Sequence, residues 1–405
     1  MALLVRTAFA ALAMAAVGTA AITAVSAQSQ NNEKAQQSAG ESEKKAGKGE
    51  EANPSLARAD KDMRAVLETL KELGAKPLHT LTVEEARKGP TPGDAAKAVM
   101  SKNGKKQPEP NVRKENVQYT AAAGEQPARI YIPTPATGKQ AQSDQPMPVI
   151  LYFHGGGWVI ADLDTYDASA QALAQKTNAI VVSAEYRHAP ENKFPAAHDD
   201  AFAAYRWVLE NAQKWGGDPQ RVAVAGESAG GNLAINVAIA ARDNNVQAPV
   251  HMLLVYPVAG TDTNTESYKE NAEAMPLGKA DMEWFIDKVL ADKSQMNDPR
   301  LDIVGRAKLE NLPPATVITA QIDPLRSEGR ALAAKLREAG SEVTTQNYEG
   351  ATHEFFGMAG VVRDAEQAQA LAVRELREAF NQSAATGAGS GTAGKSEKGE
   401  PKGKK

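Results

Sequence analysis

The chain holds a serine in a setting that suits a nucleophile, within Gly226-Glu227-Ser228-Ala229-Gly230. An apolar run, Val222 to Ala225, precedes this Gly-x-Ser-x-Gly pattern, and a stretch rich in Ala, Leu and Ile, 232–241, comes after it. Strand, tight turn and helix in that order predict a nucleophile elbow. The turn should force Ser228 into a strained backbone conformation, which glycine two residues away on either side permits. The alternative is an ordinary glycine-rich turn.

A serine nucleophile needs a base, and the base needs an orienting acid. On a fold with such an elbow the acid and then the histidine follow the serine in the chain. His251 and His353 are the histidines that follow Ser228, and His251 begins an apolar run typical of a packed strand. His353 lies just past the last predicted strand, and Asp323 comes directly after another. His353 is therefore the candidate base and Asp323 the candidate acid, although Asp323 also suits a turn or a helix cap.

A glycine-rich loop provides candidate donors for a developing negative charge. His154-Gly155-Gly156-Gly157-Trp158 follows a strand that ends at Phe153. Successive glycines expose backbone N–H groups and tolerate any φ, so this loop can point two donors into one cavity. Together with the N–H of Ala229 at the helix start they would form a three-donor oxyanion hole. A flexible loop is the alternative.

The elements around these residues alternate between strands and helices. Strands are expected at 116–120, 128–132, 148–153, 179–184, 222–225, 251–255, 315–319 and 343–348, and helices at 202–209, 232–241, around 332–336 and at 365–380. This alternation predicts an α/β fold with a mostly parallel central sheet covered by helices on both faces. In such sheets the chemistry lies at the carboxyl ends of the strands, where the candidate residues fall.

A small helical layer is expected ahead of the sheet, within residues 54–103. Apolar residues recur at helical spacing between Ala57 and Leu73, and Gly74 ends that helix; they are Met63, Val66, Leu67, Leu70 and Leu73. The layer has too few apolar residues to fold alone, so it should pack on the strands and helices that come after it in the chain.

The two ends of the chain have other compositions. Arg6, the apolar run from Ala8 to Val25 and the small residues that end at Ala27 predict a secretory signal peptide over 1–27, with an uncleaved membrane anchor as the alternative. Residues 28–53 are expected to be a disordered linker and 383–405 a disordered basic tail. The tail is either a solvated end or a weak attachment to an anionic surface. The protein is thus expected to be periplasmic or secreted.

Composition excludes several classes of function. The 405 residues carry a net charge of −4, which suggests no nucleic-acid partner. The chain has no cysteine, so disulfides, thiolate metal sites and a cysteine nucleophile are excluded. No cofactor or metal cluster is expected, the expected partner is a small-molecule ester, and the oligomeric state stays open.

Several motifs in a fixed order give the chain a resemblance to a known family; they are His154-Gly-Gly-Gly157, Tyr186-Arg-His-Ala-Pro-Glu191, Phe194-Pro-Ala196, Gly226-Glu-Ser-Ala-Gly-Gly231, Asp323-Pro-Leu325 and His353-Glu-Phe355. Over residues 55–382 the chain resembles the bacterial hormone-sensitive-lipase family of carboxylesterases, which has the α/β-hydrolase fold. The resemblance implies a hydrolase domain over 54–382, a catalytic triad of Ser228, Asp323 and His353, and oxyanion donors at Gly156, Gly157 and Ala229. It also implies a cap formed by 54–103 and about 276–296, and a preference for short acyl chains.

The sequence departs from the family pattern at three places. Glu227 stands where Asp is frequent, Ser327-Glu328-Gly329 stands where Asp-Glu-Gly is usual, and His188 occupies a position that is commonly aliphatic. His188 is expected to pack a loop, and Glu185 and Glu191 to form structural ion pairs.

The function predicted from the sequence is that of an exported serine carboxylesterase, which hydrolyses short- to medium-chain acyl esters through an acyl-enzyme. The alternatives are another acyl hydrolase on the same fold, such as an acetyl-sugar deacetylase, a lipase or a peptidase, or a non-catalytic ligand-binding protein. Fold and triad do not separate the hydrolases.

Overall fold

The structure is a computed structural model that describes residues 53–104, 111–134 and 145–389. The predicted signal peptide and nearly all of the predicted linker lie outside the described residues, as does the end of the predicted tail. None of the described helices combines the length and the apolar character that crossing a lipid bilayer requires.

The centre of the fold is an eight-stranded sheet with the order β1-β2-β4-β3-β5-β6-β7-β8. β1 and β2 run antiparallel to their neighbours, whereas β4, β3, β5, β6, β7 and β8 are mutually parallel. The predicted α/β class with a mostly parallel sheet is therefore confirmed. The strands are β1 (Val112–Ala121), β2 (Gly124–Pro133), β3 (Met147–Phe153), β4 (Ile180–Ala184), β5 (Gly217–Glu227), β6 (Met252–Val255), β7 (Ala315–Ile322) and β8 (Val343–Thr352).

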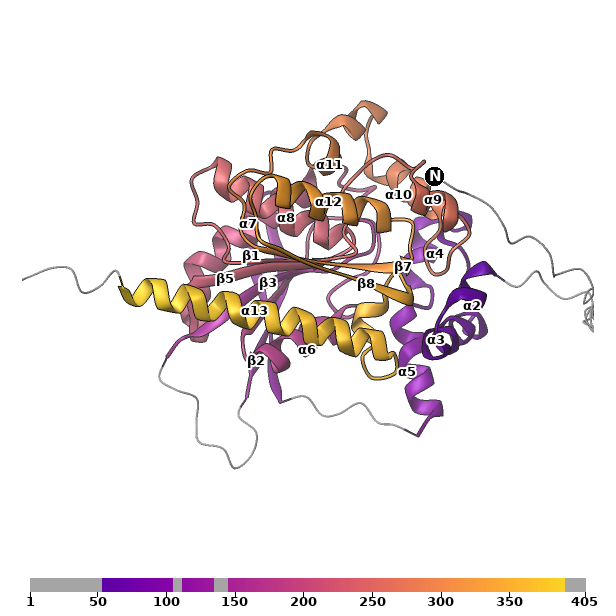
Figure 1. The fold of residues 1–405 in the computed structure, drawn as a ribbon, viewed down its shortest axis with the longest axis horizontal. Coiled ribbons are helices and arrows are strands. Elements are labelled where there is room, and N and C mark those ends of the chain that lie inside the picture. Colours follow the sequence, from indigo (N-terminus) through magenta and orange to yellow (C-terminus); the bar gives the residue numbers. More distant parts are fainter. Residues whose placement is uncertain (1–52, 105–110, 135–144, 390–405) are drawn as a thin grey trace, which may run out of the picture. The chain divides into compact units, whose positions relative to one another are not determined.

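Each face of the sheet is covered by its own layer of helices (Figure 1). Alternate residues of β3 divide between the two faces, because successive side chains of a strand point in opposite directions. Leu151 belongs to a buried apolar cluster that includes residues of α7 (Ala196–Asn211), α8 (Ala229–Asp243) and α12 (Arg326–Glu338). Ile150 belongs to a second cluster, which includes residues of α6 (Asp167–Thr177) and α13 (Arg363–Gly389). β5, which leads to Ser228, is paired on both sides and buried over Val222–Glu227.

The N-terminal layer packs on the fold as expected. The backbone N–H of Asp60 donates to Gly350 O at 3.1 Å, near the end of β8. Trp284 Nε1 donates to Leu81 O at 3.2 Å, which joins this layer to α10. The remaining helices are α2 (Pro54–Arg58), α3 (Lys61–Glu72), η1 (Leu78–Thr80), α4 (Val83–Lys88), α5 (Pro92–Lys102), η2 (Ala212–Trp215), α9 (Glu266–Glu270), α10 (Lys279–Val289), η3 (Lys293–Asn297), α11 (Ile303–Arg306) and η4 (Phe355–Met358).

Three predicted boundaries need correction. The helix expected from Ala57 is interrupted, because Ala59 is extended (φ −70°, ψ 143°) and Asp60 takes the N-cap position of α3. Asn53 accepts the N–H of Ser55 at 2.9 Å and so caps α2, which places it in the fold and outside the linker. α13 continues to Gly389, beyond the predicted boundary at 382. Ala384 and Ala385, directly after Ser383, favour continuation of the helix.

Candidate active site

Ser228 sits at the sharp turn between β5 and α8. Its backbone angles are φ 57° and ψ −118°, in a region that residues with a Cβ rarely adopt. A Cβ on Gly226 would overlap the carbonyl oxygen of Gly230, and one on Gly230 would overlap that of Phe153. The two glycines therefore allow the strand, the helix and the end of β3 to pass within backbone contact, as the sequence predicted.

Ser228, His353 and Asp323 form a chain of hydrogen bonds, although they are far apart in the sequence. His353 Nε2 lies 2.9 Å from Ser228 Oγ, and His353 Nδ1 lies 2.7 Å from Asp323 Oδ2. A carboxylate only accepts, so Nδ1 carries a proton and the neutral ring presents the lone pair of Nε2 to the hydroxyl. All three side chains are buried. This is the geometry that a base and its orienting acid need to activate a serine.

The surroundings of His353 favour its protonated form. Burial would lower the pKa of the imidazole, but the charge of Asp323 and its hydrogen bond outweigh burial, so the pKa of His353 is raised. The acid is itself held in place, because Asp323 Oδ1 accepts the N–H of Leu325 at 2.8 Å and Asn271 Nδ2 donates to Asp323 O at 3.1 Å. These contacts favour an imidazolium at His353.

The predicted oxyanion residues lie beside the elbow. Phe153, the last residue of β3, pairs with Gly226, so the loop that begins at His154 starts next to Ser228. Gly156 has φ 92° and Gly157 has φ 59°, and among the described residues no acceptor is hydrogen-bonded to either N–H. Ala229 is the first residue of α8, so its N–H has no acceptor within the helix. These N–H groups are available to an oxyanion.

Glu227, the residue that directly precedes Ser228, is buried and accepts hydrogen bonds from two tyrosines. Glu227 Oε1 accepts from Tyr152 at 2.5 Å, and Oε2 accepts from Tyr256. The Tyr256 ring packs against the His353 ring with 4.5 Å between centroids. Burial raises the pKa of Glu227 to about 7, against the lowering effect of the hydrogen bonds from Ser169, Tyr152 and Tyr256. The sequence analysis did not single out either tyrosine, because Tyr152 in β3 and Tyr256 just after β6 look like ordinary core residues.

The departure at 327–329 leaves the acid loop well supported. Ser327 N donates to Ser267 Oγ at 3.0 Å, and Ser267 Oγ donates to Pro324 O at 2.6 Å. Glu328 accepts the N–H groups of Ala259 and Gly260, at 2.9 and 3.3 Å. It therefore holds the loop after β6.

The cap candidate α10 reaches the oxyanion loop directly. A Cβ on Gly157 would overlap the ring of Phe285, so this ring fills the space where a side chain at 157 would lie. Phe285 is buried, and its ring lies 5.2 Å from that of Trp284 between centroids. Helix α10, which lies within segment 276–296, thus packs against the glycine-rich loop.

Other residues singled out in the sequence have structural contacts. His251 is buried and bonded to Thr316 Oγ1 at 2.9 Å, and burial lowers its pKa to about 4. Glu191 forms the expected ion pair, with Arg87 at 2.8 Å. Glu185 lies between His154 and His188, at 2.9 and 3.1 Å.

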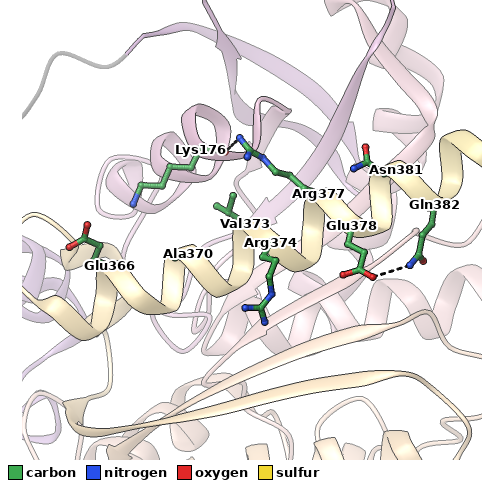
Figure 2. A pocket seen from close by; sticks show the side chains of 9 residues that line it. All are labelled: Lys176, Glu366, Ala370, Val373, Arg374, Arg377, Glu378, Asn381 and Gln382. Atoms are coloured by element: carbon green, nitrogen blue, oxygen red, sulfur yellow. Dashed lines mark hydrogen bonds between the residues drawn. The ribbon is translucent and has the colours of Figure 1, made fainter.

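A groove on the surface lies away from these residues, along α13 beside α6 (Figure 2). Lys176 and residues of α13 between Glu366 and Gln382 line it, and none of Ser228, Asp323 and His353 is among them. The groove is therefore no part of the candidate active site.

Comparison with known proteins agrees with this geometry. A family model described as alpha/beta hydrolase fold matches residues 150–357. Carboxylesterase NlhH of Mycobacterium tuberculosis is 38% identical over 279 residues, which are 68% of this chain and 84% of that protein. An ethyl acetate hydrolase of Pseudomonas putida is 32% identical over 305 residues, 75% of this chain and 92% of that one. A hyperthermophilic esterase from the archaeon Pyrobaculum calidifontis superposes with a TM-score of 0.67 at 32% identity, covering 77% of this chain and 96% of that structure.

The raised pKa of His353 predicts the acidic limb of the pH profile. His353 must be neutral to accept the serine proton, so kcat/KM falls as the pH drops through its pKa. Because that pKa lies above the usual 6.5, the midpoint is expected above pH 6.5. The measurement is kcat/KM for a non-ionising ester between pH 5 and 9. A rate that stays constant well below pH 6.5 would contradict it.

Glu227 should raise the pH at the midpoint of this acidic limb of kcat/KM. Its charge is one of the causes that raise the pKa of His353, so Glu227→Gln is expected to move the midpoint downward, by less than about one pH unit. The matched control is Glu191→Gln, which removes a carboxylate paired with Arg87 and should leave the midpoint in place. Equal midpoints in wild type and Glu227→Gln would show that Glu227 does not act on His353 through its charge.

Proposed function

The chain belongs to the alpha/beta hydrolase fold family and is a carboxylic ester hydrolase, and we propose that it is a serine carboxylesterase with Ser228 as nucleophile. The observation that carries this proposal is the continuous contact from Ser228 Oγ through the His353 ring to Asp323, at 2.9 and 2.7 Å. His353 acts as the base, and Asp323 fixes its tautomer and stabilises the imidazolium.

In the first half-reaction Ser228 Oγ attacks the ester carbonyl carbon while its proton passes to His353 Nε2. The carbonyl oxygen becomes an oxyanion, which accepts hydrogen bonds from the N–H groups of Gly156, Gly157 and Ala229. His353 then gives the proton to the alcohol oxygen, the C–O bond breaks, and the acyl group stays on Ser228. Water, deprotonated by His353, attacks the acyl-enzyme in the same way, and the acid leaves as Ser228 regains its proton.

The proposed substrates are esters of short to medium acyl chains. Segments 54–103 and 276–296 act as a cap, and the contact of Phe285 with the oxyanion loop supports this role. Each methylene bound in an apolar pocket gains about 0.8 kcal/mol until the pocket is full. Further carbons then clash, because a packed wall cannot adapt.

We also propose that the protein is exported, with a signal peptide over 1–27 and a periplasmic or extracellular destination. The support is the pattern of Arg6, the apolar run 8–25 and the small residues before position 28.

Replacing the nucleophile tests the central proposal. Ser228→Ala is expected to lower kcat by on the order of 10³-fold or more while thermal unfolding stays close to wild type. The control is Ser183→Ala, at a buried serine of β4 whose hydroxyl has no hydrogen-bond partner among the described residues. That variant should keep wild-type activity. A folded Ser228→Ala protein with near-normal rates would rule out the proposed mechanism.

The cap predicts how activity depends on acyl length. With one chromogenic alcohol, kcat/KM is expected to rise over the shortest acyl chains, peak at a short to medium length and collapse for long ones. Phe285→Ala should move the peak to longer chains, because it removes the ring beside Gly157. Lys288→Ala, on the same helix, is the control and should leave the peak in place. Efficient hydrolysis of long-chain triacylglycerols with activation at an oil–water interface would instead indicate a lipase.

If the protein is exported and its signal peptide is cleaved, the mature chain has a defined first residue. Protein recovered from the exporting cell is expected to begin at Gln28, because the small residues Val25-Ser26-Ala27 suit a signal peptidase. N-terminal sequencing or intact mass of the recovered protein measures this. A chain that still begins at Met1 would favour an uncleaved anchor.

A further inference from the structure

Three metal-ligating side chains converge next to the oxyanion loop and take no part in the proposed mechanism. They are His154 at the end of β3, and Glu185 and His188 just past β4. Their ligand atoms all lie within 4.8 Å of one another. His154 Nε2 is 2.9 Å and His188 Nε2 is 3.1 Å from the same oxygen, Glu185 Oε1.

The two nitrogens of His154 face acceptors on opposite sides of the ring. Nδ1 lies 2.8 Å from the carbonyl oxygen of Gly155, and Nε2 faces Glu185. A carbonyl oxygen only accepts, so Nδ1 carries a proton. Nε2 must then carry a second proton or coordinate a cation to sit against a carboxylate. A histidine whose Nδ1–H is fixed by a backbone carbonyl is the usual arrangement of a metal-binding imidazole.

His188 supplies the second nitrogen. Its Nε2 is buried and lies 3.1 Å from Glu185 Oε1, but it makes no well-aligned hydrogen bond to any described residue. A buried nitrogen without a hydrogen bond costs stability. A cation placed between the three groups would satisfy both imidazoles and neutralise the carboxylate.

We propose that His154, Glu185 and His188 bind a divalent transition-metal ion of the Zn²⁺ type. Two imidazoles and a carboxylate form a donor set typical of zinc sites that keep an open position for water. Bonds of about 2.0–2.2 Å at tetrahedral angles place ligand atoms about 3.3–3.5 Å apart. The two contacts of the imidazole nitrogens with Glu185 Oε1, at 2.9 and 3.1 Å, need to widen by only a few tenths of an ångström to reach that spacing. The His188 side chain is 18% exposed, which gives an ion a route from solvent.

The site joins two segments that flank the catalytic centre. His154 directly precedes the glycines of the oxyanion loop, and its ring stacks on Tyr186 with 4.6 Å between centroids. An ion there would tie this loop to the segment after β4. Because an ion held by side chains from two segments that are far apart in the sequence binds the native state in preference to the unfolded chain, it should also stabilise the fold.

The test is metal binding by the full chain prepared without a polyhistidine tag. Zn²⁺ is titrated calorimetrically, and Co²⁺ is titrated optically because its visible d–d bands report four- or five-coordination. We expect one equivalent to bind and the thermal midpoint to rise with Zn²⁺ concentration. His188→Leu, which keeps the His154–Glu185 pair, should raise the dissociation constant at least tenfold and abolish the Zn²⁺-dependent rise.

His79→Gln is the matched control. His79 lies at the surface against Asp281, at 2.8 Å, and so offers another histidine–carboxylate pair outside the proposed site. This variant should bind Zn²⁺ as the wild type does. The proposal is overturned if the wild type shows no binding at millimolar Zn²⁺, or if His188→Leu binds with an unchanged dissociation constant. All readouts are of binding and unfolding, so they stay valid whether or not Ser228 is the nucleophile.

Discussion

The backbone of Ser228 holds a conformation that costs about 1–3 kcal/mol, and the surrounding structure keeps it there. Its N–H donates to Val255 O at 2.9 Å, and its carbonyl accepts from Asn232 and Val258, each at 3.2 Å. At about 1 kcal/mol per hydrogen bond, the combined free energy of these three contacts is similar to the free-energy cost of the strained backbone. They come from α8 and from the end of β6 and the loop after it, so the position of the hydroxyl at the turn depends on the packing of several elements around the sheet. The glycines on either side make that packing possible, because each lies against a backbone carbonyl.

Two histidine–carboxylate pairs lie near the elbow, and they differ in the groups that the two ring nitrogens contact. In both pairs burial opposes the charge on the ring, and the carboxylate outweighs it and raises the imidazole pKa. His353 meets Asp323 on one side and a hydroxyl on the other, so the ring can lose and regain a proton at Nε2. His154 is held between the Gly155 carbonyl at Nδ1 and the Glu185 carboxylate at Nε2. Its environment therefore suits fixing the oxyanion loop and does not suit proton transfer.

Features that depend on local pattern were predictable from the sequence. The strands, the elbow and the positions of Asp323 and His353 after strands follow from short apolar runs and from where they stop. The tyrosines that hold Glu227 were not predictable, since Tyr152 and Tyr256 are 75 and 29 residues away from it and look like ordinary core residues. The break at Ala59 and the extension of α13 were missed because capping and helix propensity act at single residues. His188 was interpreted as a packing residue, since its alignment with His154 appears only when β3 and β4 pair.

Helix α10, part of the proposed cap, packs against the loop that carries Gly157, and this contact would link substrate choice to rate. Gly157 keeps its left-handed backbone next to the Phe285 ring, with no room between them for a Cβ. In the proposed mechanism, a change that moves α10 would therefore alter both the wall of the proposed acyl site and the packing around the Gly157 N–H. α10 is in turn attached to the N-terminal layer through Trp284 and through His79, whose Nδ1 lies 2.8 Å from Asp281. Substitutions in that layer, although remote from Ser228 in the sequence, should alter kcat together with acyl preference, because one packed surface determines both.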